Sequence, residues 1–192
     1  MRHSFLCVCA ATAALALAGQ RGLPAEPPPE EPQPPQDAWT SVEDVPMPTM
    51  GGTQFWADEL FFHRWRIQRN VLTGHYRLLD GNNLRHAWGT YEHCRAKLEE
   101  IKAKEKLPSM AGKAIVLLHG LGGTRMEMSR LANYLEEEGN YTAFNVAYPS
   151  TRQGIAEHAR SLAKVVDSLA EMEEINFVGF SMGNIVIRHY LA

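Results

Sequence analysis

A glycine-rich corner near the end of the sequence constrains the fold more than any other feature. Residues 175–178 form a short apolar run rich in branched side chains, which is typical of a buried strand. From Met182 onward apolar residues recur at helical spacing, so we expect a helix to start directly after Ser181. Side chains two residues before or after Ser181 would collide with the neighbouring elements, and Gly179 and Gly183 remove that clash. The sequence therefore predicts a sharp strand-to-helix turn that projects the Ser181 hydroxyl from the top of a sheet.

A second motif lies about sixty residues upstream. Residues 114–118 form an apolar run without alternation, which is typical of a strand covered on both faces, and it leads into the glycine-rich loop 119–123. A capping box of Thr124 and Glu127 then predicts a helix that Gly139 closes. A strand at 141–148, a helix at 151–170 and the strand at 175–178 are expected to follow. This alternation predicts a parallel sheet with right-handed crossovers. In this sheet strand 114–118 is expected to lie beside strand 175–178, which we call the elbow strand because it leads into the sharp turn, or elbow, at Ser181.

Together the two motifs resemble those of the α/β-hydrolase fold, and within it the bacterial lipases and esterases with a His-Gly oxyanion loop. The matching residues are His119-Gly120-Leu121-Gly122-Gly123 and Gly179-Phe180-Ser181-Met182-Gly183, and the resemblance extends over roughly residues 60–192. It implies that Ser181 is the nucleophile and that the backbone N–H groups of Leu121 and Met182 form the oxyanion hole. It also implies structural roles for His119, Gly120 and Gly122 in the loop and for Gly179 and Gly183 at the elbow. Phe180 departs from the family pattern, in which many lipases have histidine.

The catalytic base has no candidate within reach. His189 lies about 12 Å along the elbow helix, at 1.5 Å per residue. His119 belongs to the loop. His158 lies on a predicted helix, where its side chain can face solvent instead of acting as the base. Because the family order is Ser, then Asp or Glu, then His, we expect the acid and the histidine beyond residue 192. The sequence then covers the N-terminal half of the domain only. We expect this piece alone to be inactive, with an unpaired apolar edge on the elbow strand.

Upstream of residue 114 the patterns are less regular. Alternation over residues 61–67 predicts one half-buried strand, and residues 75–79 predict a second, with 70–74 as the turn of an antiparallel hairpin. Residues 80–83 form a turn cluster, and apolar spacing from Trp88 to Ile101 predicts an amphipathic helix. The expected fold class is thus α/β, with an N-terminal β-hairpin and helix leading into a parallel, doubly wound sheet.

Three segments are predicted along the chain. Residues 1–19 resemble a secretory signal peptide with a cleavage site near Ala18, which predicts a secreted or periplasmic protein; an uncleaved anchor or a mis-called start codon is the alternative. Residues 20–50 read as a linker, because nine of the eleven prolines fall between Pro24 and Met50. Residues 51–192 form the incomplete hydrolase domain.

Charge and cysteine content narrow the functional classes. The net charge of −3 gives no indication of a nucleic-acid partner. After removal of the signal peptide Cys94 is the remaining cysteine, so no internal disulfide or cysteine-based metal site is expected. We interpret Cys94 as a core residue, and His63 and His75 as strand residues rather than metal ligands.

The sequence therefore predicts a serine ester hydrolase, lipase-like or esterase-like, that forms a covalent acyl-enzyme on Ser181 without metal or organic cofactor. The expected partner is a small-molecule or lipid ester, with transient contact to a lipid interface left open and no specific protein partner. A thioesterase, an amidase, an acyltransferase and a non-catalytic binding domain remain alternatives on the same scaffold.

Overall fold

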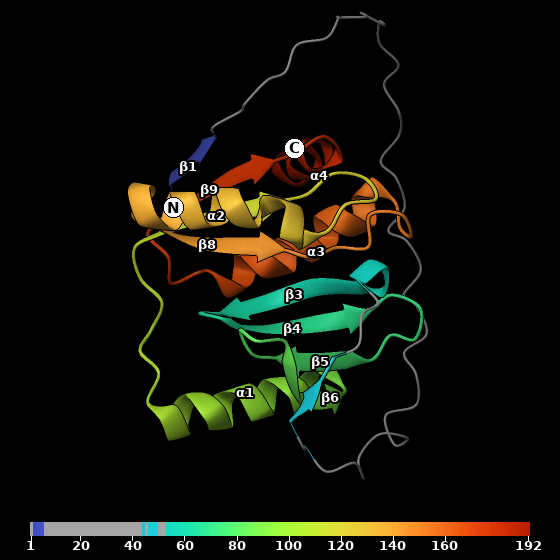
Figure 1. The fold of residues 1–192 in the computed structure, drawn as a ribbon, viewed down its shortest axis with the longest axis vertical. Helices are drawn as coiled ribbons and strands as arrows, with labels where there is room; N and C mark the ends of the chain where they lie inside the picture. The colour runs from blue at the N-terminus through green and yellow to red at the C-terminus, as the bar shows by residue number, and fades with distance from the viewer. Residues whose placement is uncertain (1, 6–43, 45, 50–52) are drawn as a thin grey trace, which may run out of the picture.

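The computed structural model describes residues 2–5, 44, 46–49 and 53–192, which form two β-sheets and four α-helices (Figure 1). Most of the predicted signal peptide and linker lies outside these residues. Within the described part no helix is long and apolar enough to cross a membrane.

The parallel sheet holds the C-terminal half of the chain. Its strand order is β1 (Arg2–Phe5), β9 (Glu174–Gly179), β7 (Lys113–Leu118) and β8 (Tyr141–Val146). The strands β9, β7 and β8 run parallel, in a register that aligns Leu118 with Gly179 and with Val146. The sequence-based prediction that strand 114–118 lies beside the elbow strand is confirmed.

The far edge of β9 differs from the expectation. Residues Arg2–Phe5 pair with β9 in parallel, so in the structure this edge is not open. These four residues belong to the segment interpreted as a signal peptide, and that interpretation stays a prediction.

Helices cover both faces of the parallel sheet. Even-numbered residues of β7 (Ala114, Val116, Leu118) join the larger apolar cluster, with α3 (Ile155–Ser168) and α4 (Met182–Leu191). Odd-numbered residues (Ile115, Leu117) pack on the opposite face against η3 (Arg125–Met128) and α2 (Ser129–Gly139). Burial on both faces explains why the β7 sequence is apolar without alternation.

The antiparallel sheet forms a separate layer. Its order is β2 (Met47–Pro48), β6 (Leu84–Gly89), β5 (Tyr76–Leu79), β4 (Trp65–Asn70) and β3 (Trp56–Phe62), with η2 (Thr53–Phe55) leading into β3. Helix α1 (Tyr91–Glu105) packs on this sheet, and α3 packs against β3 between the two sheets (Figure 1). The observed fold is a mixed α/β fold in which the N-terminal part is a five-stranded sheet rather than the expected hairpin.

Several boundaries predicted from the sequence were wrong. The single strand expected at 61–67 is two strands, joined by a turn at His63 and Arg64 in which His63 has a φ of 50°. A two-residue turn preserves the alternation of period two, so the pattern continued through it. Trp88 lies in β6, and α1 starts only after Thr90, whose side chain accepts a hydrogen bond from the His93 N–H. Asn140, not Gly139, takes the left-handed conformation that ends α2.

Asp58 of β3 joins the two sheets. Its backbone N–H donates to Ala147 O at 2.9 Å, and its Oδ2 accepts from Ala147 N at 2.6 Å. Its Oδ1 accepts from Gln68 Nε2 at 2.7 Å and lies 3.8 Å from Arg66 Nη1. The carboxylate is fully buried, and Ala147 directly follows β8. Asp58 therefore fixes the antiparallel sheet against the carboxyl end of β8.

The substitution Asp58→Asn tests this joint. It keeps the size of the side chain but removes the negative charge opposite Arg66. It also replaces one carboxylate oxygen by an NH2 group, which then faces a donor, either Gln68 Nε2 or the Ala147 N–H. We expect the free energy of unfolding in urea to fall by about 3 kcal/mol. Asp167→Asn makes the same change on the exposed face of α3 and should stay within about 0.5 kcal/mol of the original protein. Equal stability of the two variants would contradict the role of Asp58.

Candidate functional site

Ser181 stands at the corner between β9 and α4. Its backbone angles φ and ψ are 51° and −116°, a combination that residues other than glycine rarely adopt. The residue is exposed, although Gly183 just beyond it is buried. The backbone strain thus coincides with the presentation of a hydroxyl group to solvent.

Two glycines make this corner possible. A Cβ at Gly179 would lie 2.5 Å from the Asn184 backbone nitrogen, and a Cβ at Gly183 would lie 2.5 Å from Leu118 O. Both contacts are with backbone atoms, which cannot swing aside. The steric reason inferred from the sequence for these two glycines is therefore present in the structure.

The loop 119–123 contacts the elbow directly. The Phe180 N–H donates to Leu118 O at 2.9 Å, where β7 ends. A Cβ at Gly120 would lie 3.2 Å from the Cβ of Ser181 and 3.1 Å from the Phe180 ring. The absence of a side chain at Gly120 therefore lets this loop pass beside the serine.

The two amides assigned to the oxyanion hole border this contact. Met182 is the first residue of α4, where backbone N–H groups lack helical partners and the helix dipole is positive. Leu121 lies in the exposed part of the loop, before Gly122, which has a φ of 73°. Within the described part of the chain neither amide donates a hydrogen bond. Both donors are available to a ligand, and their catalytic roles stay predictions.

Side chains from other elements hold the loop in place. The Gly122 N–H donates to Ser150 Oγ at 2.9 Å, and Gln54 Nε2 donates to Gly123 O at 2.9 Å. Gln54 Oε1 in turn accepts from the hydroxyl group of Thr151 at 3.0 Å. Sequence reasoning missed Ser150 and Gln54. Ser150 could have been found, because it follows the strand 141–148 at the carboxyl edge of the sheet, but no sequence pattern marks Gln54.

His119 is built into the scaffold below the loop. Its ring is buried, lies 2.8 Å from Gly120 O through Nδ1, and stacks on Tyr148 with 4.3 Å between the ring centres. The Tyr148 hydroxyl group donates to His119 O. Burial lowers the pKa of His119, with the backbone acceptor at Gly120 opposing that shift. The buried imidazole thus lies against the loop backbone, and the structural role assigned to His119 stays a prediction.

No described histidine hydrogen-bonds to Ser181 in residues 53–192. His158 is only 2% exposed and packs edge-on against Tyr148, so the solvent-facing alternative was wrong. Burial is the main cause that lowers its pKa. His189 is exposed on α4, two helical turns beyond the serine.

The described residues contain no group of three His, Cys, Asp or Glu side chains arranged to hold a metal ion. His63 Nε2 lies 2.8 Å from Pro108 O, and His75 packs edge-on against Trp56 and Trp88. Cys94 is buried in the core, and burial raises the pKa of its thiol to about 12. The interpretation of Cys94 as a core residue is confirmed.

Comparison with known families agrees with this geometry. Residues 109–192 match a family described as "Putative serine esterase (DUF676)". The matched segment runs from just before β7 to the end of α4 and so contains both the loop and the elbow. The similarity indicates a serine esterase-like protein at the level of the family. No curated protein and no solved structure matches the chain.

Alanine at either elbow glycine tests the steric argument. We expect Gly179→Ala and Gly183→Ala each to lower the free energy of unfolding in urea by at least about 2 kcal/mol, because the new methyl group meets fixed backbone atoms. Gly154→Ala is the matched control: its Cβ would meet only the flexible end of Glu157, and the loss should stay below about 1 kcal/mol. The account fails if all three variants lose the same amount.

Proposed function

We propose that this chain carries the nucleophile and the oxyanion hole of a serine ester hydrolase with an α/β-hydrolase-type site. The observation that carries the proposal is the exposed Ser181, held at a strained elbow in contact with the Gly120 loop. The family similarity over residues 109–192 supports the same class of activity.

The proposed reaction proceeds in two steps. The Ser181 oxygen attacks the ester carbonyl carbon while a histidine base takes the hydroxyl proton, and the carbonyl oxygen becomes an oxyanion that accepts from Leu121 and Met182 N–H. The intermediate collapses as the histidine returns the proton to the departing alcohol, which leaves an acyl group on Ser181. In the second step water attacks the carbonyl carbon of the acyl-enzyme while the histidine takes a proton from the water. The histidine then returns this proton to the Ser181 oxygen, and the carboxylic acid is released. No metal or organic cofactor takes part in this scheme.

The acid and the histidine of the triad are proposed to lie beyond residue 192. The buried imidazoles of His119 and His158 are held within the scaffold, and His189 points into solvent from α4. The chain order of such triads places the acid and then the histidine after the nucleophile. In this proposal residues 53–192 alone bind and orient an ester without turning it over.

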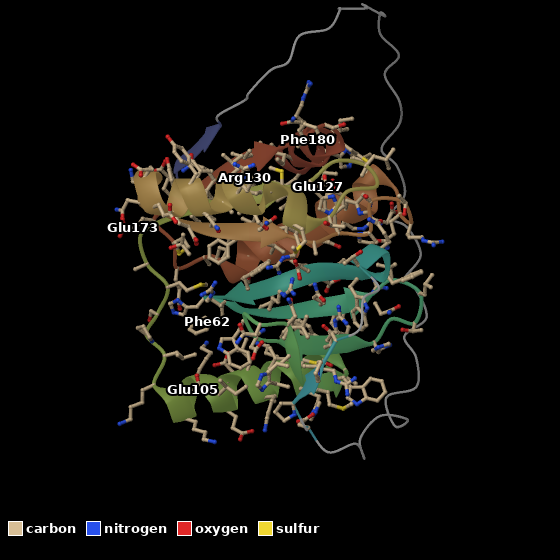
Figure 2. All side chains as sticks on the ribbon, in the orientation of Figure 1. Phe62, Glu105, Glu127, Arg130, Glu173 and Phe180 are labelled. Carbon is tan, nitrogen blue, oxygen red and sulfur yellow. The ribbon has the colours of Figure 1, made fainter. Side chains whose placement is uncertain are left out.

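Exposed apolar side chains lie on the elbow, on the loop and on η3, which follows the loop. Phe180, Leu121 and Met126 are 61%, 66% and 74% exposed, and they come from the elbow, the loop and η3. Figure 2 shows Phe180 beside the start of α4, with Glu127 of η3 below it. Such a rim favours an ester with an apolar acyl or alcohol group, and it supports the proposal of transient contact with a lipid interface. The proposal that the protein is secreted or periplasmic rests on the signal-like pattern of residues 1–19.

A fluorophosphonate probe tests the nucleophile in the full-length protein. The probe phosphorylates activated serines, so we expect stoichiometric labelling at Ser181, located by peptide mass spectrometry. Ser181→Ala should abolish the labelling and lower kcat/KM for a p-nitrophenyl ester by about a thousandfold or more. Ser109→Ala, which removes an exposed serine outside the site, should change neither quantity.

Absence of labelling in folded full-length protein would favour a non-catalytic binding domain. Labelling without ester turnover, but with turnover of a thioester or an amide, would replace the proposed substrate class and keep the nucleophile.

A further inference from the structure

A basic crevice lies between the two sheets, away from the proposed active site. It has a volume of about 220 Å³ and separates the β3–β4 and β5–β6 turns from η3, α2 and β8. Three arginines, Arg64, Arg66 and Arg125, line it. Neither Ser181 nor any residue of loop 119–123 lines this crevice, so it is distinct from the Ser181 corner, although η3 borders both.

Arg66 provides the main evidence. The residue is only 5% exposed, and its Nη2 donates to Asn83 Oδ1. Its Nη1 is buried without a hydrogen-bond partner among the described residues; the nearest carboxylate oxygen is Asp58 Oδ1 at 3.8 Å. A buried guanidinium donor without an acceptor is costly, and such a donor is rare in folded proteins.

Asp58 forms an ion pair with this nitrogen but no hydrogen bond, because 3.8 Å is beyond hydrogen-bond distance. Both of its oxygens already accept short hydrogen bonds, from Gln68 Nε2 and from the Ala147 N–H. Asp58 is also shared with a second guanidinium: burial and Arg66 lower the pKa of Arg77 to about 10, while Asp58 opposes the shift. Asp58 thus acts on two guanidinium groups, the buried one of Arg66 and the half-buried one of Arg77.

Arg125 adds a third cation to the same space. Burial lowers the pKa of Arg66 and the like charge of Arg125 lowers it further, while Asp58 and Asp80 oppose the shift. Like charges brought together repel unless an anion lies between them. Asp80, which also lines the crevice, has its carboxylate engaged by two backbone N–H groups and by His86.

Other groups in the crevice are polar. Asn145 Oδ1 is buried without a donor among the described residues, and the amide nitrogen of the same side chain donates to Arg125 O at 2.5 Å. The hydroxyl groups of Ser129 and Thr142 also line the space. Glu136 is the second acid there, and its Oε1 accepts from the Ala143 N–H. The crevice therefore offers donors for an anion and one acceptor for a protonated oxygen.

We propose that this crevice binds a phosphate group, with Arg66 Nη1 and the Arg125 guanidinium donating to its oxygens and Asn145 Oδ1 accepting from its protonated oxygen. Arginine forks match the tetrahedral oxygens of phosphate. Near neutral pH inorganic phosphate carries both charge and a remaining proton, whereas a phosphomonoester, with a second pKa of about 6, holds that proton only in its monoanion. A carboxylate would leave Asn145 Oδ1 without a donor. The phosphate group belongs either to inorganic phosphate or to a phosphomonoester.

Calorimetric titration and thermal unfolding of the full chain test the site. Potassium phosphate should bind in a saturable way and raise Tm, whereas potassium chloride and acetate at equal ionic strength should not. Glycerol phosphate in place of phosphate separates the two sources: tighter binding identifies a phosphomonoester, and equal or weaker binding identifies inorganic phosphate.

Matched charge variants complete the test. Arg125→Gln should weaken phosphate binding about tenfold or more, as expected for the loss of a charged hydrogen bond. Arg66→Gln should do the same if it folds. Arg130→Gln removes an exposed charge on α2 outside the crevice (Figure 2) and should change the affinity less than twofold. A Tm shift with phosphate no larger than with chloride would overturn the proposal, as would equal weakening by Arg125→Gln and Arg130→Gln.

Discussion

The close approach of two backbone segments is the constraint on which the proposed site depends. The end of β7 and the start of α4 touch through Gly183, where a side chain would meet Leu118 O, and the loop beyond β7 passes Ser181 through Gly120. Adjacent parallel strands bring both segments to one edge of the sheet. The strain at Ser181 is tolerated because the flanking strand and helix are packed in the core. The glycines thus allow the loop after β7 and the corner at Ser181 to lie in direct contact.

The antiparallel sheet contributes to this arrangement although no active-site motif lies in it. Asp58 fixes β3 to Ala147, the residue after β8. Gln54, in the η2 turn that leads into β3, donates to the backbone carbonyl of Gly123 in the loop. Ser150 supports the neighbouring amide from the end of β8. Loop 119–123 is therefore held from two sheets, which preorganises its backbone before any ligand binds. The family similarity covers residues 109–192, so Gln54 and Asp58 lie outside the matched segment.

The sequence predicted the parallel half well because its signals are local. The apolar run of β7, the glycines around Ser181 and the capping box of Thr124 and Glu127 each fix a conformation by short-range sterics or hydrogen bonds. The antiparallel half depends on contacts between distant residues. The turn at His63 kept the alternation in phase, and Trp88 matched the spacing of the helix that follows it. Gln54 meets the loop only when the N-terminal half packs on the parallel sheet, and His158 is buried against Tyr148, which follows β8; no local sequence pattern marks either contact.

The most direct test of the central claim is a crystal structure of the full-length protein with a phosphonate ester bound covalently to Ser181. The phosphoryl oxygen mimics the oxyanion of the tetrahedral intermediate. We predict that this oxygen lies 2.7–3.1 Å from both the Leu121 and the Met182 backbone nitrogens. An adduct whose oxygen points to solvent, or that contacts neither amide, would contradict the account.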